Sequence, residues 1–155
     1  MKKKLVIRIL LITVSLFLVV NIAWAVIRNA ECRRFVKGFD KLETSTLMVP
    51  RYALADEQGF TYAVKYPDYL SLTGNLSVCL PEEDGSLFVD SLIIWFGAGN
   101  KLEYGVVLYD DDEMYQIEID RQGNPLDTEF EYIADKHKEN IELLISAANQ
   151  IWNLD

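Results

Sequence analysis

Residues 70–80 read LSLTGNLSVCL, and this stretch alternates apolar and polar side chains almost throughout. Successive side chains of a strand point to opposite faces of a sheet, so alternation with a period of two is typical of a strand with one buried face. We therefore predict a strand here. Its inward face carries Leu70, Leu72, Gly74, Leu76, Val78 and Leu80, and its outward face carries Ser71, Thr73, Asn75, Ser77 and Cys79.

Further strands are predicted on both sides of this one. Residues 60–66 alternate in the same way, and residues 87–96 are apolar on both faces apart from two polar residues, which is typical of a central strand. Turn-forming residues delimit two more predicted strands, at 102–109 and 114–120. Because the connecting turns are short, we expect the five strands to pair as antiparallel hairpins.

The carboxyl-terminal segment predicts an amphipathic helix. Thr128 and Glu131 have the spacing of a capping box, in which a hydroxyl and a carboxylate bind free amide groups at a helix start. From there to about Asn153, apolar residues recur at every third or fourth position and form one stripe. The stripe consists of Phe130, Ile133, His137, Ile141, Leu144, Ala148 and Trp152.

Together these elements predict an α+β fold, in which a five-stranded antiparallel β-meander is covered by the carboxyl-terminal amphipathic helix. The apolar stripe of the helix needs a cover, and the apolar face of the meander supplies one. An alternative closes the five strands into a small, partly open barrel with the helix across one end. The sequence leaves both arrangements open.

The amino-terminal segment begins with basic residues and continues as a long apolar run. A transmembrane helix needs about 20 mostly apolar residues, and residues 9–27 come close to that length, with Asn21 as the one strongly polar residue. A secretory signal peptide is the alternative, because the tripeptide AWA at 23–25 has small residues at the spacing of a cleavage site. We favour the uncleaved anchor, since the apolar run continues to Ile27 and Trp24 suits a membrane interface.

The chain is accordingly divided into four parts. A short basic segment at 1–8 precedes a transmembrane signal-anchor at 9–27, or a signal peptide cleaved after Ala25. A juxtamembrane arm or short helix follows at 28–50, and one α+β domain occupies 51–155. The few residues before the apolar run favour an amino terminus in the cytoplasm. We therefore expect a single-pass cell-membrane protein with its domain outside the cytoplasm, or a domain secreted after signal cleavage.

Charge is distributed unevenly along the chain. Seven of the 15 basic residues but only one of the 24 acidic residues lie at or before Arg34, which leaves eight basic and 23 acidic residues, a net charge of −15, beyond it. A domain with this negative net charge repels the phosphates of nucleic acid, so we expect no nucleic-acid partner. If the domain has a macromolecular partner besides the membrane, we expect a basic protein.

Acidic residues are concentrated in two turns. Successive turns of a meander alternate between the two ends of the sheet, so the turn after the second predicted strand and the turn after the fourth lie at the same end. Clustered carboxylates attract hard cations such as calcium, which takes about six to eight oxygen ligands, but the spacing of a calcium-binding loop is absent. We favour solvated turns, with a cation site or a docking surface as alternatives. The residues are Glu82, Glu83, Asp84, Asp110, Asp111, Asp112 and Glu113.

Residues that often carry chemistry are few. His137 is the only histidine, and on an apolar helical stripe we expect it to pack with one ring nitrogen hydrogen-bonded. Cys32 and Cys79 are the only cysteines; they could pair only if the arm that bears Cys32 folds back to within about 7 Å, and we favour two free thiols. Cys79 lacks an activating motif and points away from the face that the helix covers, so nothing supports a nucleophile pair with His137. The sequence therefore predicts no catalytic, cofactor-binding or metal site.

Aromatic residues fall mostly at inward positions and are expected to pack in the core. Tyr66 and Tyr69 flank a turn, which makes this turn the first place to look for an exposed aromatic patch.

Three classes of function remain open. We favour a membrane-tethered, non-enzymatic interaction or accessory module with a strongly acidic surface, because the chain has a tether and a strong negative charge but no assembled catalytic set. The alternatives are a secreted or tethered module that binds a cation or a small ligand, and an enzyme of unfamiliar type.

Overall fold

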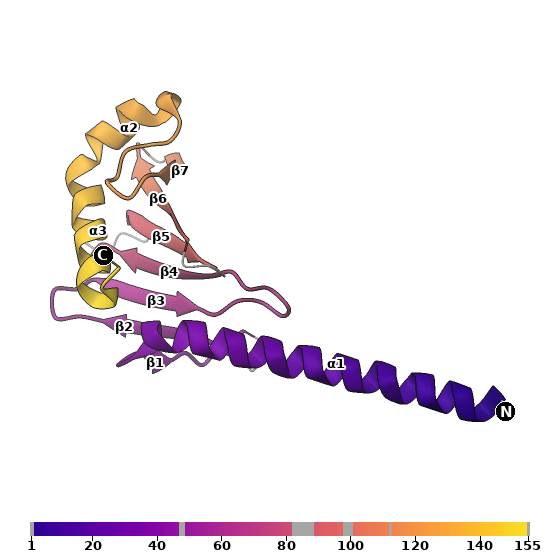
Figure 1. Cartoon of the computed structure of the whole chain (residues 1–155). Coiled ribbons are helices and arrows are strands. Elements are labelled where there is room, and N and C mark those ends of the chain that lie inside the picture. Colours follow the sequence, from indigo (N-terminus) through magenta and orange to yellow (C-terminus); the bar gives the residue numbers. More distant parts are fainter. Residues whose placement is uncertain (1, 47–48, 82–88, 98–100, 112, 155) are drawn as a thin grey trace.

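A computed structural model of the chain describes residues 2–46, 49–81, 89–97, 101–111 and 113–154. A long helix extends from one side of a domain built from a sheet and shorter helices (Figure 1). In chain order the elements are α1 (Lys2–Cys32), the 3-10 helix η1 (Arg33–Val36), β1 (Asp40–Lys41), β2 (Arg51–Ala55), β3 (Thr61–Lys65), β4 (Gly74–Cys79), β5 (Ser91–Phe96), β6 (Leu102–Asp110), β7 (Glu113–Ile119), the 3-10 helix η2 (Thr128–Phe130), α2 (Glu131–Lys136) and α3 (Lys138–Trp152).

The described strands form one antiparallel sheet in which neighbours along the chain are also neighbours in space, from β1 to β7. An α+β fold with an antiparallel meander is therefore confirmed, but the described residues hold seven strands rather than five. The additional strands β1 and β2 lie at one edge. The first has two residues, and the second is too short and too mixed in its burial to produce a clear alternation. The sheet is open between its edges β1 and β7, so the barrel alternative is wrong.

The strand predicted at 70–80 is shorter in the structure, because β4 starts only at Gly74. Both neighbouring strands end opposite Gly74 and Asn75, so the residues before them have no strand to pair with. Leu70 and Leu72, which we expected to face the core, lie instead in the β3–β4 loop, with 52% and 41% of their surface exposed.

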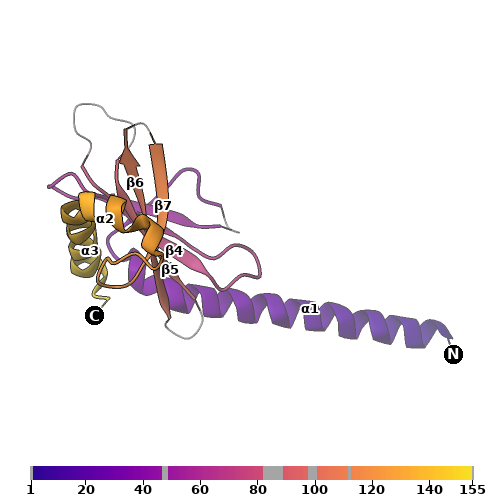
Figure 2. The ribbon, with the colours of Figure 1, turned by 90° about the horizontal axis from the view of Figure 1, so that it is seen from above.

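One face of the sheet is covered by α3, as predicted (Figure 2). Alternate residues of β3 to β7 are buried on this face, and the apolar stripe of α3 packs across β4 and β5. Each aliphatic side chain that is fully buried contributes about 1.5–3 kcal/mol to stability. The centre of this core consists of Leu76, Val78, Leu92, Ile94, Val106 and Leu108 from the strands and Ile141, Leu144 and Ala148 from α3.

The helical segment has a different capping residue from the predicted one, and it is divided into two helices. Asp127, rather than Thr128, is the cap: its side chain accepts a hydrogen bond of 3.1 Å from the backbone nitrogen of Glu129. The predicted single helix is interrupted at His137, which separates α2 from α3. Asn153 ends α3 in the left-handed conformation, with φ of 49°, a common way to terminate a helix.

The amino-terminal and carboxyl-terminal parts of the domain meet on the sheet face that α3 covers. The indole nitrogen of Trp152, at the end of α3, donates a 3.0 Å hydrogen bond to the carbonyl oxygen of Phe35 in η1. The ring of Trp152 stacks with Phe39 at a centroid distance of 6.0 Å, and Phe35 packs against Phe96 at 4.9 Å. The start of the arm between the apolar helix and β2, through Phe35 and Phe39, therefore belongs to the core of the domain.

Within the described residues, α1 is the one helix whose length and composition suit a membrane span. Its side chains from Lys3 to Val20 are all exposed, for example Ile12 at 68%. From Asn21 onward, one side of the helix packs against the domain.

On the sheet face opposite α3, the indole ring of Trp95 lies over Gly105. A Cβ atom at Gly105 would come within 2.8 Å of that ring and 3.2 Å of the carbonyl oxygen of Ile117. Glycine is therefore needed at this position by the close approach of a neighbouring side chain.

The variant Gly105→Ala should lower the free energy of unfolding by about 1–3 kcal/mol, because the ring and the strands beneath it must shift. Urea denaturation of the full chain in detergent micelles measures the change. Gly97→Ala is the matched control, since its Cβ would meet only an ordinary contact, 3.5 Å from Thr73, and should change stability by less than about 0.5 kcal/mol. Equal losses in both variants would contradict this role of Trp95.

Candidate functional site

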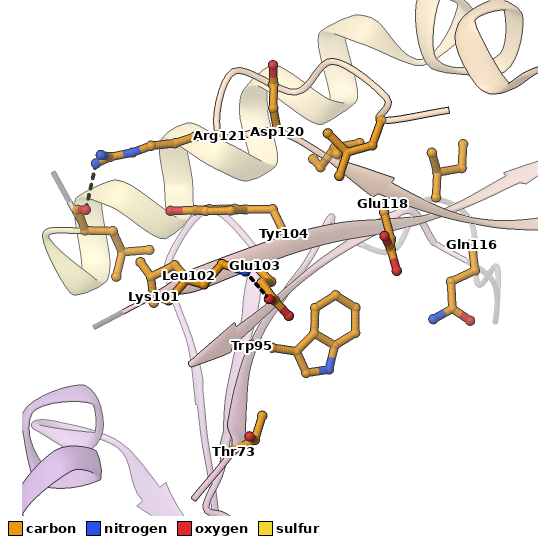
Figure 3. Close-up of a pocket in the computed structure, with 14 residues that line it drawn as sticks. Thr73, Trp95, Lys101, Leu102, Glu103, Tyr104, Gln116, Glu118, Asp120 and Arg121 are labelled. Atoms are coloured by element: carbon orange, nitrogen blue, oxygen red, sulfur yellow. Dashed lines mark hydrogen bonds and ion pairs between the residues drawn. The ribbon is translucent and has the colours of Figure 1, made fainter. Parts of the chain in front are cut away.

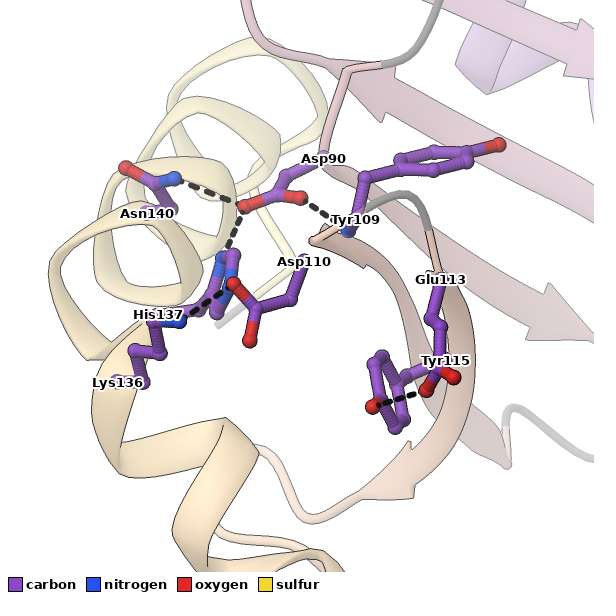
Figure 4. Close-up of polar contacts among 8 residues, drawn as sticks. All are labelled: Asp90, Tyr109, Asp110, Glu113, Tyr115, Lys136, His137 and Asn140. Atoms are coloured by element: carbon purple, nitrogen blue, oxygen red, sulfur yellow. Dashed lines mark hydrogen bonds and ion pairs between the residues drawn. The ribbon is translucent and has the colours of Figure 1, made fainter.

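Asp90 is a buried carboxylate at the start of β5, beneath the amino-terminal end of α3 (Figure 4). Its Oδ1 accepts a hydrogen bond of 2.9 Å from the backbone nitrogen of Tyr109 in β6. Its Oδ2 accepts one of 2.8 Å from the side-chain nitrogen of Asn140 and lies 2.7 Å from Nδ1 of His137. One carboxylate thus joins the sheet to α3 and to the junction between α2 and α3.

His137 has the packed position that the sequence predicts, with one ring nitrogen bound to Asp90. Its side chain is only 12% exposed. The second ring nitrogen, Nε2, is buried, lies 4.0 Å from Oδ1 of Asp110, and has no hydrogen-bond partner among the described residues.

A carboxylate bound to an imidazole is also the arrangement that orients a catalytic base. Such a base needs a nucleophile or a substrate within reach of its second ring nitrogen. In His137 that nitrogen is buried, and Cys79 is on the opposite face of the sheet, because it alternates with the buried Val78. The geometry therefore supports a structural role for Asp90 and His137.

The variant Asp90→Ala should lower the free energy of unfolding by on the order of 3 kcal/mol, because it leaves the partly buried nitrogen groups of Tyr109, His137 and Asn140 without this acceptor. Thermal unfolding followed by tryptophan fluorescence measures the loss. Asp111→Asn is the control: Asp111 is exposed, and its replacement should change stability by less than about 0.5 kcal/mol. A stable Asp90→Ala variant would refute the proposed link between sheet and helix.

The predicted acidic cluster is described only in part. Asp110 forms an ion pair with Lys136, which raises the pKa of that lysine through the shared hydrogen bond. Glu113 accepts a 2.7 Å hydrogen bond from the hydroxyl of Tyr115, and Asp111 is exposed. Two of these three carboxylates therefore bind groups of the same chain. The other four predicted residues lie outside the described part of the chain: Glu82, Glu83, Asp84 and Asp112.

Two described residues that flank the two acidic turns do meet: Asp90, after the first turn, binds the backbone nitrogen of Tyr109, before the second. In the described ranges, His, Cys, Asp and Glu residues form no group of three or more that could hold a metal ion. A cation site at these turns is therefore not assembled by the described residues alone.

The two cysteines are free in the structure. Cys32 is fully buried at the end of α1, on the core side of the sheet, and Cys79 is half-buried on the other side. Burial raises the pKa of the Cys79 thiol, which lowers the fraction of reactive thiolate at neutral pH.

An open groove of about 870 Å³ runs along β6 and β7 (Figure 3). Its charged groups have both signs, and three of them bind close partners: Lys101 pairs with Glu103 at 2.8 Å, and Arg121 donates a 2.7 Å hydrogen bond to the carbonyl oxygen of Leu154. Trp95 is a half-buried aromatic residue in its lining.

The expectation that most aromatic residues pack in the core holds only in part. Tyr62, Tyr66, Tyr104 and Trp152 are buried, whereas Trp95, Tyr109 and Tyr115 are half-buried and Tyr69 and Tyr132 are exposed.

A second, smaller hollow of about 580 Å³ lies between residues 122–125 and the helices α2 and α3. Its charged lining consists of the carboxylates of Glu131, Asp135 and Glu142 and the ammonium of Lys138, and Tyr132, which is 78% exposed, also lines it. This hollow combines negative charge with an accessible aromatic ring.

The wall of this hollow formed by residues 122–125 is ordered by Asp120. Its Oδ1 accepts hydrogen bonds from the backbone nitrogens of Gln122 (2.8 Å) and Asn124 (2.9 Å), and its Oδ2 accepts one from the side chain of Asn124. Desolvation opposes ionisation of Asp120, but these hydrogen bonds and one from Gly123 outweigh it and lower its pKa.

The β3–β4 loop forms a junction with the last turns of α1. Trp24 donates a 2.7 Å hydrogen bond from its indole nitrogen to the carbonyl oxygen of Ser71, and its ring meets that of Tyr69 edge-on at 5.3 Å. The hydroxyl of Tyr69 donates to the side-chain oxygen of Asn21. The guanidinium of Arg28 lies over the ring of Trp24, 4.4 Å from its centre.

Only half of the predicted aromatic patch is exposed at this junction. Tyr69 is 40% exposed, whereas Tyr66 is buried. The contact itself is not evident from the sequence, although Trp24, Arg28, Cys32 and Phe35 recur at helical spacing. An apolar helix has no polar face against which such a stripe stands out.

Comparison with known proteins finds no matching family model, no matching curated protein and no matching solved structure. The function is therefore argued from the sites of this chain.

Proposed function

We propose that this protein is a single-pass membrane protein whose uncleaved helix α1 holds an acidic, non-enzymatic interaction domain outside the cytoplasm. The observation that carries the proposal is the junction between α1 and the domain. Trp24 and Arg28 are 9% and 7% exposed, so the end of the apolar helix is part of the domain's packing.

This packing argues for an uncleaved helix. Cleavage after Ala25 would remove Trp24 and Asn21, and with them the partners of Ser71 and Tyr69. It would also remove the cation–π contact between the ring of Trp24 and the guanidinium of Arg28. A chain designed for cleavage has no need of such contacts across the cut site.

The surface of the domain supports a basic partner. Beyond Arg34 the chain carries a net charge of −15, and a field of this strength steers positively charged proteins toward it. The hollow beside α2 is the proposed contact surface. Tyr132 supplies an exposed ring of the kind enriched at the centre of interfaces, and three carboxylates against one ammonium, that of Lys138, leave the lining with a net negative charge.

Intact mass of the protein extracted from membranes tests the anchor. The proposal predicts the mass of a chain that retains residues 1–25, and protease added outside intact cells should degrade the domain. A mass that corresponds to a chain beginning at Val26, or a domain shielded from the protease, would contradict the proposed anchor or its orientation.

Charge reversal in the hollow tests the partner. The double variant Glu131→Lys, Asp135→Lys in the full chain should lose at least tenfold in affinity for a captured basic protein, and added salt should weaken binding to the unmodified chain. The variant Glu43→Lys, Glu57→Lys makes the same change of net charge at exposed positions elsewhere. Equal binding by both double variants would exclude the hollow as the docking surface.

A further inference from the structure

The β3–β4 loop, residues 68–73, exposes apolar side chains that contribute little to the core. Tyr69, Leu70 and Leu72 have exposed fractions of 40%, 52% and 41%. Leu70 also has a positive φ of 60°, a conformation that a leucine seldom adopts, so the surrounding loop must hold it there. Large apolar side chains grouped in this way are typical of a contact surface.

The loop has a defined shape. Asp68 forms an ion pair of 3.0 Å with Lys65, and its carbonyl oxygen accepts a 2.9 Å hydrogen bond from the backbone nitrogen of Ser71. The backbone nitrogen of Thr73 donates to the hydroxyl of Ser71 at 3.1 Å. The carbonyl oxygen of Ser71 in turn accepts the indole hydrogen bond from Trp24, so the loop is fixed to α1.

The position of this loop along α1 is decisive. The loop projects from the domain along the helix, toward its amino terminus, in both views (Figures 1 and 2). Tyr69 reaches Asn21, which stands six residues before Ile27, the last apolar residue of the run. At a rise of about 1.5 Å per residue, the loop tip lies about 9 Å from the end of the apolar segment, measured along α1 toward its amino terminus.

The apolar side chains of α1 that follow Asn21 on the side away from the loop are exposed. Ile22, Val26 and Ile27 are 61%, 62% and 46% exposed. Lipid that surrounds these residues would also contact the loop, because Trp24 of the helix and Tyr69 of the loop touch each other.

Basic residues follow the apolar run, beginning with Arg28, and three more stand at least six residues after Ile27. Arg33, Arg34 and Lys37 are all exposed, whereas the nearby carboxylate of Asp68 is paired with a lysine. Apolar side chains bordered by exposed basic groups match the boundary between acyl chains and anionic headgroups.

We infer that residues 68–73 form a second membrane contact, in which Tyr69, Leu70 and Leu72 insert beside α1 at the boundary between headgroups and acyl chains. The inference rests on the proposed membrane span of α1. The domain is then held against the bilayer in one orientation instead of swinging on a flexible tether.

Depth-dependent fluorescence quenching tests this contact. The full chain carrying Leu72→Cys, with Cys79→Ser to remove the half-buried thiol, is labelled with an environment-sensitive dye and reconstituted into vesicles of phosphatidylcholine and phosphatidylglycerol. Cys32 is fully buried, and mass spectrometry verifies that it stays unlabelled. Lipids with a nitroxide near the headgroup should quench the dye at position 72 strongly.

Glu57→Cys in the same background is the matched control. Glu57 is exposed in the turn between β2 and β3, at the opposite end of β3 from the loop (Figure 1). Quenching at position 72 should exceed quenching at position 57 several-fold, and a water-soluble quencher should show the reverse order.

Each other outcome overturns the inference in a distinguishable way. If the chain floats with the vesicles but both positions are quenched equally, the loop contact is refuted and the anchor stands. If position 72 is shielded from the water-soluble quencher but not quenched by lipid, a protein surface such as a second copy covers the loop. If the chain does not float with the vesicles, the proposed anchor and the loop contact both fail.

Discussion

The structure depends on the way the indole of Trp24 fits between the apolar helix and the domain. Its ring meets Tyr69 on one side and the guanidinium of Arg28 on another, and its nitrogen binds the loop carbonyl of Ser71. A buried indole stabilises a structure only if its N–H finds an acceptor, and here the loop supplies one. This contact makes α1 and the sheet a single body, so the orientation of the helix determines the orientation of the domain.

The same constraint continues into the core. The turn of helix after Arg28 brings Cys32 and Phe35 under the sheet, and the carbonyl of Phe35 accepts the hydrogen bond from Trp152 at the far end of the chain. Asp90 then fixes the beginning of α3. The acidic residues outside this framework give the domain its negative charge, and the proposed recognition of a basic protein rests on that charge.

Much of the fold could be predicted because its elements bury one face at a regular period. The alternation in β4 and the stripe of α3 both correspond to residues that are buried in the structure. The edge strands β1 and β2 were missed because they are short and bury little. Leu70 and Leu72 continue the alternation of β4 but have no paired neighbours, so the pattern overstated the strand.

The candidate sites were harder to predict for a different reason. The acidic turns were recognised from composition, yet composition does not reveal that Asp110 and Glu113 bind groups of their own chain. The break at His137, which sets the ring against Asp90, depends on a contact between residues far apart in the sequence. Likewise, the docking of Trp24 was hidden within a segment that is apolar on every side.

The most direct test of the account is the stability of the full chain in detergent micelles after replacement of Trp24 by alanine. Urea denaturation, followed by the fluorescence of Trp95 and Trp152, should show the domain less stable by about 3 kcal/mol. Phe17→Ala, at a position of α1 that is 60% exposed, should leave it unchanged. Equal stability of the two variants would show that the apolar helix and the domain are independent, and would contradict the account.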